Sequence, residues 1–180
     1  MRIYKENSIG VLIDVQEKLL PHMYNKDEVK DNCLKLVHGL RILNVPVIVT
    51  QQYTKGLGNT IEELNTAAGN FSYIEKLTFS CYREPSFIKV MNRSGKRNAI
   101  IMGIESHVCV LQTALDLLYN NFNPIIVTDA IGSRKKPDMD AALWRMRDVG
   151  CILTTTESIM FELCIQAGTP EFKEISKIVK

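Results

Sequence analysis

The sequence has little excess charge of either sign and no long apolar segment. Its 22 basic and 20 acidic residues leave a formal net charge of +2, and its largest basic cluster is Arg134-Lys135-Lys136. Nucleic acids and anionic membranes attract concentrated positive charge, so neither is indicated as a partner. No apolar run approaches the roughly 18 residues that a transmembrane helix needs. The first residues, MRIYKENSIG, lack an apolar signal-peptide core, and we expect no secretion signal there.

The cysteines and histidines are too scattered for a disulfide framework or a metal cluster. The cysteine number is odd, no two cysteines form a CxxC pair, and the histidines lack HxxxH or HExxH spacing. We therefore expect no bound metal or other cofactor, and free thiols in a reducing cytoplasm. The residues concerned are Cys33, Cys81, Cys109, Cys151, Cys164, His22, His38 and His107.

Apolar residues make up 46% of the sequence, enough for one globular domain over residues 1–180. Short apolar runs alternate with segments of helical period. Continuous apolar runs are typical of strands buried on both faces, so the pattern predicts an α/β fold with a mainly parallel six-stranded sheet between helices. For the strand order we predict 3-2-1-4-5-6. The predicted strands lie at 9–13, 45–52, 73–78, 99–102, 124–128 and 151–154.

The fourth apolar run leads into a candidate reactive residue. Ala99 to Met102 is followed by Gly103, and from His107 the apolar residues recur with helical spacing. Cys109 then lies in the first turn of a helix, where unpaired backbone N–H groups favour a thiolate and lower the thiol pKa. The alternative is a packed, unreactive thiol, because free cysteine is among the most buried residue types.

A carboxylate and an ammonium accompany two other predicted strands. Asp14 comes directly after the run at 9–13, and Lys76 lies in the run at 73–78. In the predicted order, strands 1 and 4 are neighbours where the winding direction reverses, so Asp14 and Cys109 meet in one crevice. Lys76 must reach them across strand 2. Alternatively, Asp14 stabilises a turn and Lys76 protects an edge strand from aggregation.

These three side chains suit acyl transfer to water. Asp14 can take the thiol proton of Cys109, and Lys76 can stabilise the thiolate or the departing amine. Backbone N–H groups at the start of the following helix can stabilise an oxyanion. The predicted activity is metal-independent hydrolysis of a small amide or related C–N substrate through a thioester at Cys109.

Six segments resemble the isochorismatase-like cysteine hydrolase superfamily, which includes nicotinamidases and N-carbamoylsarcosine amidase. They are Asp14-Val15-Gln16, TQQYTKGLG at 50–58, EKLTFS at 75–80, GIESHVC at 103–109, DAIGSR at 129–134 and FELCIQAGTPEFK at 161–173. The likeness extends over nearly the whole chain. It is greatest for the small isochorismatase-domain branch, which carries a T-E-Q-Y-P-x-G-L-G segment.

The resemblance implies a Rossmann-like three-layer α/β/α fold, a catalytic triad of Asp14, Lys76 and Cys109, and a homo-oligomer. It also implies a cis peptide between Ile104 and Glu105. That bond would turn the N–H of Glu105 toward the oxyanion, beside the N–H of Cys109.

The family pattern also bears on the substrate, which we expect to be a small molecule. Residues 51–58 have no histidine or acid where nicotinamidases carry metal ligands, so metal-assisted nicotinamide binding is not expected. Isochorismatases proper lack the cysteine, which argues against vinyl-ether hydrolysis. The candidate substrate-pocket residues are Gln16, Gln52 and Phe79.

Two other functions are compatible with the same residues. One is a non-catalytic partner-binding protein on the isochorismatase-like scaffold. The other is thiol redox sensing through Cys109, for which Cys81 would be the resolving cysteine. A complete triad favours the enzyme, because a binding module needs none of the three residues.

Overall fold

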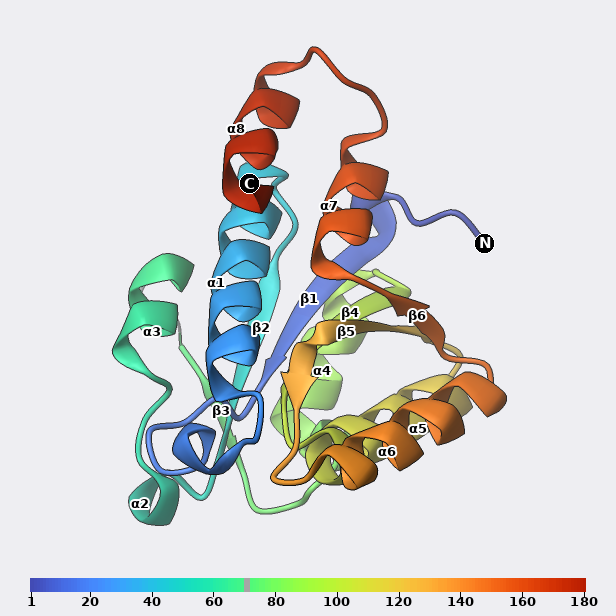
Figure 1. The fold of residues 1–180 in the computed structure, drawn as a ribbon. Coiled ribbons are helices and arrows are strands. Elements are labelled where there is room, and N and C mark those ends of the chain that lie inside the picture. Colours follow the sequence, from blue (N-terminus) through green and yellow to red (C-terminus); the bar gives the residue numbers. More distant parts are fainter. Residues whose placement is uncertain (70–71) are drawn as a thin grey trace.

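A computed structural model describes residues 1–69 and 72–180 (Figure 1). Within these residues a parallel sheet runs in the order β3-β2-β1-β4-β5-β6, which confirms the predicted order. β1 and β4 are buried along their whole length, which accounts for their uninterrupted apolar runs. The strands are β1 (Ser8–Ile13), β2 (Val47–Gln52), β3 (Ile74–Lys76), β4 (Asn98–Ile104), β5 (Asn123–Gly132) and β6 (Ile152–Thr154).

Helices cover both faces of the sheet, so the Rossmann-like three-layer α/β/α fold is confirmed. None of the helices described is long and apolar enough to cross a membrane. One face carries α1 (Lys26–Ile42), α3 (Glu62–Ala68), α7 (Thr156–Cys164) and α8 (Pro170–Val179). The other carries α4 (Pro85–Ser94), α5 (Leu111–Tyr119) and α6 (Lys136–Asp148), and the single turn α2 (Thr54–Leu57) follows β2.

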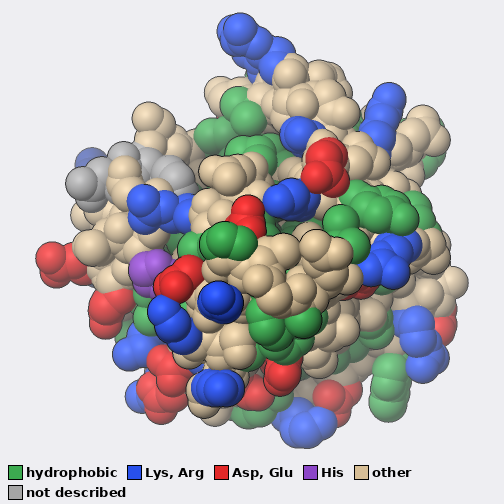
Figure 2. Space-filling view, turned by 90° about the horizontal axis from the view of Figure 1, so that it is seen from above, with side chains coloured by type: hydrophobic (Ala, Val, Ile, Leu, Met, Phe, Trp, Pro, Cys, Tyr) green, Lys and Arg blue, Asp and Glu red, His purple; other side chains and the backbone are tan. Residues whose placement is uncertain are grey.

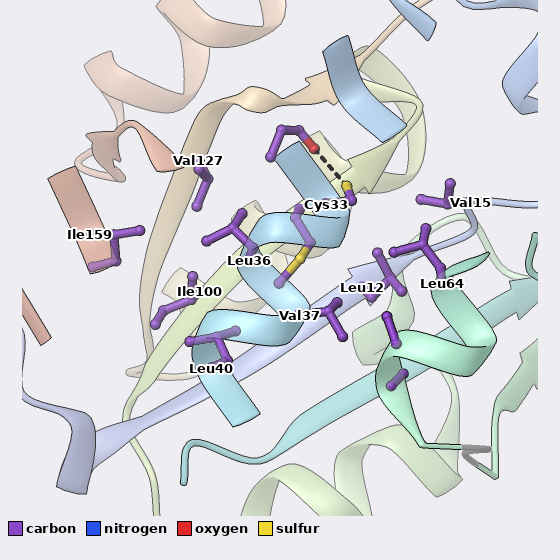
Figure 3. Packing of buried hydrophobic residues seen from close by; sticks show 14 of the residues in the cluster. Leu12, Val15, Cys33, Leu36, Val37, Leu40, Leu64, Ile100, Val127 and Ile159 are labelled. Carbon is purple, nitrogen blue, oxygen red and sulfur yellow. Dashed lines mark hydrogen bonds between the residues drawn. The ribbon is translucent and has the colours of Figure 1, made fainter. Parts of the chain in front are cut away.

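The core on the first face is organised around one stripe of α1 (Figure 3). Its fully buried side chains recur every three or four residues, the spacing of one helix face. They meet apolar side chains from the sheet and from two neighbouring helices. The labelled members are Cys33, Leu36, Val37 and Leu40 of α1, with Leu12, Val15, Ile100, Val127, Ile159 and Leu64 around them.

A glycine lets β4 run close against the end of β1. Gly103 has φ +119°, and a Cβ at this position would collide with the carbonyl oxygen of Ile13. Only glycine accommodates both the positive φ and this close approach. Asp14, the next residue after Ile13, has φ +51°, an uncommon conformation for a residue with a side chain. The chain therefore turns sharply at Asp14, directly beside the end of β4.

Several element boundaries differ from the predicted ones. β4 runs through Gly103 to Ile104 instead of ending at 102, and β2 begins at Val47 instead of at 45. β5 continues to Gly132 instead of ending at 128, because after an irregularity it pairs again with β4. The third strand is shorter than 73–78 and ends at Lys76, where the chain turns away. The helix predicted from His107 begins as a π-helical turn, Ser106–Val110, and becomes α-helical only at Leu111.

Candidate active site

The structure brings Asp14, Lys76 and Cys109 together at the carboxyl edge of the sheet. Asp14 follows β1, Lys76 ends β3, and Cys109 lies in the π-helical turn between β4 and α5. Lys76 Nζ is 2.6 Å from Asp14 Oδ2 and 3.7 Å from Cys109 Sγ. The carboxyl ends of parallel strands share one edge, which is why residues so distant in sequence meet here.

Lys76 is a buried ammonium and not a solvated edge lysine. Its side chain and that of Asp14 are fully buried. Besides its contacts with Asp14 and Cys109, Lys76 Nζ donates to Gln52 Oε1 at 2.8 Å. It also lies 3.2 Å from the carbonyl oxygens of Thr78 and Phe79. Burial by itself would lower the pKa of this ammonium. The Asp14 carboxylate outweighs burial and raises its pKa.

The surroundings of Cys109 raise the pKa of its thiol. The residue is only 7% exposed. Burial raises the pKa of the thiol, the Asp14 carboxylate raises it further, and the Lys76 ammonium opposes both. The prediction of a lowered pKa from the helix start is therefore wrong, because desolvation and a neighbouring carboxylate exceed the effect of the helix terminus. The site therefore favours the thiol form of Cys109 over the thiolate, beside the Lys76–Asp14 salt bridge.

This protonation state can be checked by ultraviolet absorbance of the thiolate. We expect the wild type and Cys109→Ala to have the same thiolate absorbance at pH 7, because a thiol with a raised pKa stays protonated there. The difference should emerge only above the pH at which ordinary cysteine ionises, about 8.5. The urea-unfolded proteins are the control, since unfolding restores the ordinary pKa. A thiolate difference already present at neutral pH would contradict the resting state described above.

The turn that carries Cys109 is tied to the segment after β5. The peptide bond between Ile104 and Glu105 is cis. The Glu105 carboxylate accepts a hydrogen bond from Arg134 Nε at 2.8 Å, and His107 Nδ1 lies 3.0 Å from Ser133 Oγ. The carbonyl of Glu105 accepts from two N–H groups of the turn itself. That the N–H groups of Glu105 and Cys109 form an oxyanion hole stays a prediction.

The three candidate substrate-pocket residues have different surroundings. Gln16 is buried, and its amide binds backbone groups of Gln52 and Gly58 at 2.7–3.0 Å, so it holds the loop after β2 against β1. Gln52 is half-buried and contacts Lys76. Phe79 is 54% exposed. It lines a cavity of about 350 Å³ with Thr78, Ser80, Arg83, Gln112, Leu115 and Asp116.

Two residues near the triad were not among the predicted catalytic or substrate-pocket residues, although Cys81 was considered as a resolving cysteine for Cys109. The hydroxyl of Thr50 donates to Asp14 Oδ1 at 2.7 Å, and the thiol of Cys81 donates to Thr50 Oγ1 at 3.7 Å. The position of Thr50 near the carboxyl end of β2 was the available signal. Burial raises the pKa of Cys81 to about 11, with the Asp14 carboxylate as the next contribution. Among the residues described, no group of three or more histidine, cysteine or acidic side chains could hold a metal ion.

The parallel three-layer fold, with this cluster at its carboxyl edge, defines an isochorismatase-like α/β protein. The family model "Isochorismatase domain" matches residues 8–158, and the chain belongs to this family. A similar protein is isochorismatase domain-containing protein 2A of Mus musculus. The two are 38% identical over 180 residues, which cover 99% of this chain and 85% of the mouse protein.

Solved structures show the same fold. The MAR1 ribonuclease from Caenorhabditis elegans has a TM-score of 0.93 and 37% identity, covering 99% of this chain and 92% of that chain. YcaC from Pseudomonas aeruginosa, with hexane-2,5-diol and covalent acrylamide, has a TM-score of 0.92 and 29% identity over 98% of this chain and 91% of that chain. YcaC from Escherichia coli, an octameric hydrolase of unknown specificity, has a TM-score of 0.92 and 26% identity, covering 99% of this chain and 90% of that chain.

Proposed function

We propose that this protein is a cysteine hydrolase that cleaves a small amide or related C–N substrate through a thioester at Cys109. The observation that carries the proposal is the contact of one buried ammonium, Lys76, with both the Asp14 carboxylate and the Cys109 thiol. A thiol with a raised pKa needs a base at the moment of attack. Asp14 is the base in this arrangement.

In the first half of the reaction, Cys109 Sγ forms a bond to the carbonyl carbon of the substrate while its proton passes to Asp14. The carbonyl oxygen becomes an oxyanion, for which we assign the N–H groups of Glu105 and Cys109 as donors. When the oxyanion collapses, the C–N bond breaks. The amine departs with the proton from Asp14, and a thioester remains.

In the second half, Asp14 takes a proton from water as the water oxygen attacks the thioester carbonyl. The C–S bond then breaks, the acid product leaves, and the sulfur regains a proton. Throughout the cycle the Lys76 ammonium balances the negative charge that moves between carboxylate and sulfur. None of these steps uses a metal or another cofactor.

The relatives support the chemistry and the assembly. Acrylamide is an electrophile, and its covalent attachment in the Pseudomonas YcaC structure fits a nucleophilic residue on this scaffold. The Escherichia coli YcaC structure is described as an octameric hydrolase. We accordingly assign this chain a homo-oligomeric state. Its five cysteines are all free thiols, which fits a reducing cytoplasm.

The direct test is turnover of a panel of small amides, ureides and carbamoyl compounds, measured as release of the amine. In parallel, the native protein is alkylated with iodoacetamide and analysed by mass spectrometry. Cys109 should be labelled faster than the other four cysteines, because Asp14 assists the deprotonation of its thiol. No turnover together with equal labelling of all five cysteines would contradict the proposal. If a partner protein then co-purified with both the wild type and Cys109→Ala, the non-catalytic binding function would replace it.

A single-stranded RNA belongs in the same panel, because one similar structure is that of a ribonuclease. We expect no RNA cleavage, since the net charge is only +2. On the face shown in Figure 2, basic side chains are interspersed with acidic ones. A strand of RNA would need a continuous basic track. RNA cleavage that disappears in Cys109→Ala would overturn the amide assignment.

A further inference from the structure

The strand between Asp14 and Lys76 supplies contacts to both of them. β2 lies between β1 and β3 in the sheet. Its register places Thr50 beside Ile13, the residue before Asp14, and Gln52 beside Lys76. Residues two apart in a strand project from the same face. Thr50 and Gln52 are thus the two β2 residues that can meet the ion pair.

Thr50 fixes one oxygen of the carboxylate. Its hydroxyl donates to Asp14 Oδ1 at 2.7 Å, while Lys76 Nζ binds Oδ2. The Thr50 backbone carbonyl also accepts from the N–H of Asp14 at 3.2 Å. The donor direction of the hydroxyl is set by Cys81, whose thiol donates to Thr50 Oγ1. With a donor on each oxygen, the carboxylate has one defined orientation.

Gln52 fixes the ammonium in the same way. Its Oε1 accepts from Lys76 Nζ at 2.8 Å. The other end of the amide donates to the carbonyl of Leu77 at 2.9 Å, and the Gln52 N–H donates to Gln16 Oε1 at 2.7 Å. The amide therefore cannot rotate without losing a hydrogen bond. It holds Lys76 Nζ where the ammonium reaches both the carboxylate and the sulfur.

We propose that Thr50 and Gln52 are positioning residues of the hydrolase, Thr50 for the base Asp14 and Gln52 for the ammonium Lys76. This inference rests on the proposed function, since it concerns the same triad. Proton transfer and nucleophilic attack depend steeply on geometry, and a misplacement of about 1 Å can cost roughly a hundredfold in rate. Neither residue needs to touch the substrate to affect the rate.

The test uses iodoacetamide as the probe, because alkylation of Cys109 also requires loss of the thiol proton. The second-order labelling rate of Cys109 is measured on the native full-length protein at neutral pH by mass spectrometry. Thr50→Val keeps the shape and removes the hydroxyl, and we expect the rate to fall at least about tenfold. Thr50→Ser keeps the hydroxyl and should restore the rate to within about threefold of wild type.

Thr156→Val is the matched control for Thr50. The Thr156 hydroxyl also donates to an aspartate, Asp129 Oδ1, at 2.9 Å, but it does so at the start of α7. Both valine variants should lower the thermal midpoint, because each removes one hydrogen bond to a carboxylate. Only Thr50→Val should slow Cys109 labelling.

Gln52→Met and Gln52→Glu form the second pair. Methionine fills similar space without an acceptor, and we expect Cys109 labelling to slow at least about tenfold. Glutamate keeps an oxygen in reach of the ammonium, so the labelling rate should stay within about threefold of wild type. Gln51→Met is the control. Gln51 is the adjacent buried glutamine, and its amide binds the hydroxyls of Thr60 and Thr54 instead of Lys76.

The outcomes separate this inference from the proposed function. Fast, selective labelling of wild-type Cys109 with unchanged rates in Thr50→Val and Gln52→Met would overturn the inference and leave the hydrolase intact. Equal slowing in Thr50→Ser and Thr50→Val would also overturn it, because the hydroxyl would then not be the responsible group. Wild-type Cys109 that labels no faster than the other cysteines, in a protein that hydrolyses none of the amide panel, would remove the proposed function and the inference together.

Discussion

Cys109→Ala is expected to abolish turnover of any amide that the wild type hydrolyses. We expect kcat to fall by about 10⁴-fold or more, the scale at which removal of a covalent nucleophile acts in other acyl-transfer enzymes. The acyl group then has no sulfur to bond, so the thioester cannot form. Asp14 and Lys76 remain in place, but they can only assist direct attack of water on the amide carbonyl. Amine release under substrate saturation measures the loss.

The control for this variant is Cys151→Ala. Cys151 is a buried thiol just before β6, and burial raises its pKa to about 11, so it is chemically inert at neutral pH. Its truncation should cost some stability and leave kcat unchanged. Acid quenching of the wild type during turnover should also trap the acyl group on the peptide that contains Cys109. Wild-type kcat in Cys109→Ala would falsify the thioester mechanism.

Lys76→Met is expected to destabilise the protein by roughly 3–5 kcal/mol, because it leaves the buried Asp14 carboxylate without its counter-charge. Both side chains are fully buried and 2.6 Å apart. Urea unfolding at neutral pH measures the change in the free energy of unfolding. Lys136→Met is the matched control, since Lys136 pairs with Asp140 at 2.6 Å on the surface of α6. That exposed pair is screened by solvent, so its loss should lower the free energy of unfolding far less than the loss of Lys76.

The double variant Asp14→Asn/Lys76→Met should recover much of the lost stability, because it removes both buried charges. The pKa of Lys76 is raised in the folded protein. The stability that this group contributes is therefore fully present below the ordinary lysine pKa, about 10.4, and is lost as the pH rises through the raised value. The difference between wild type and Lys76→Met should stay constant around neutrality. A cost no larger than that of Lys136→Met would show that the pair is not buried in solution.

The parallel sheet could be predicted from the sequence pattern, and the meeting of the triad followed once the usual doubly wound strand order was assumed. Uninterrupted apolar runs predict buried parallel strands, and parallel strands carry their carboxyl ends to one edge. Asp14 directly follows one such run, Cys109 follows another after a short turn, and Lys76 ends the short edge strand β3. Element ends were predicted less well. β5 extends through 129–132 because it pairs again with β4, and pairing between strands is not a local property.

The sequence by itself determined the α/β architecture and the three chemical groups that follow or end its strands, since these depend on local apolar period and on which residue comes after each strand. Tertiary structure alone decided the direction in which the pKa of Cys109 is shifted and the contacts of Thr50 and Gln52 with the Asp14–Lys76 pair. A pKa depends on burial and on charges brought in from other strands, and a hydrogen bond depends on distances of a few tenths of an ångström. Neither the shifted pKa of Cys109 nor these hydrogen bonds exist until the three layers have packed together.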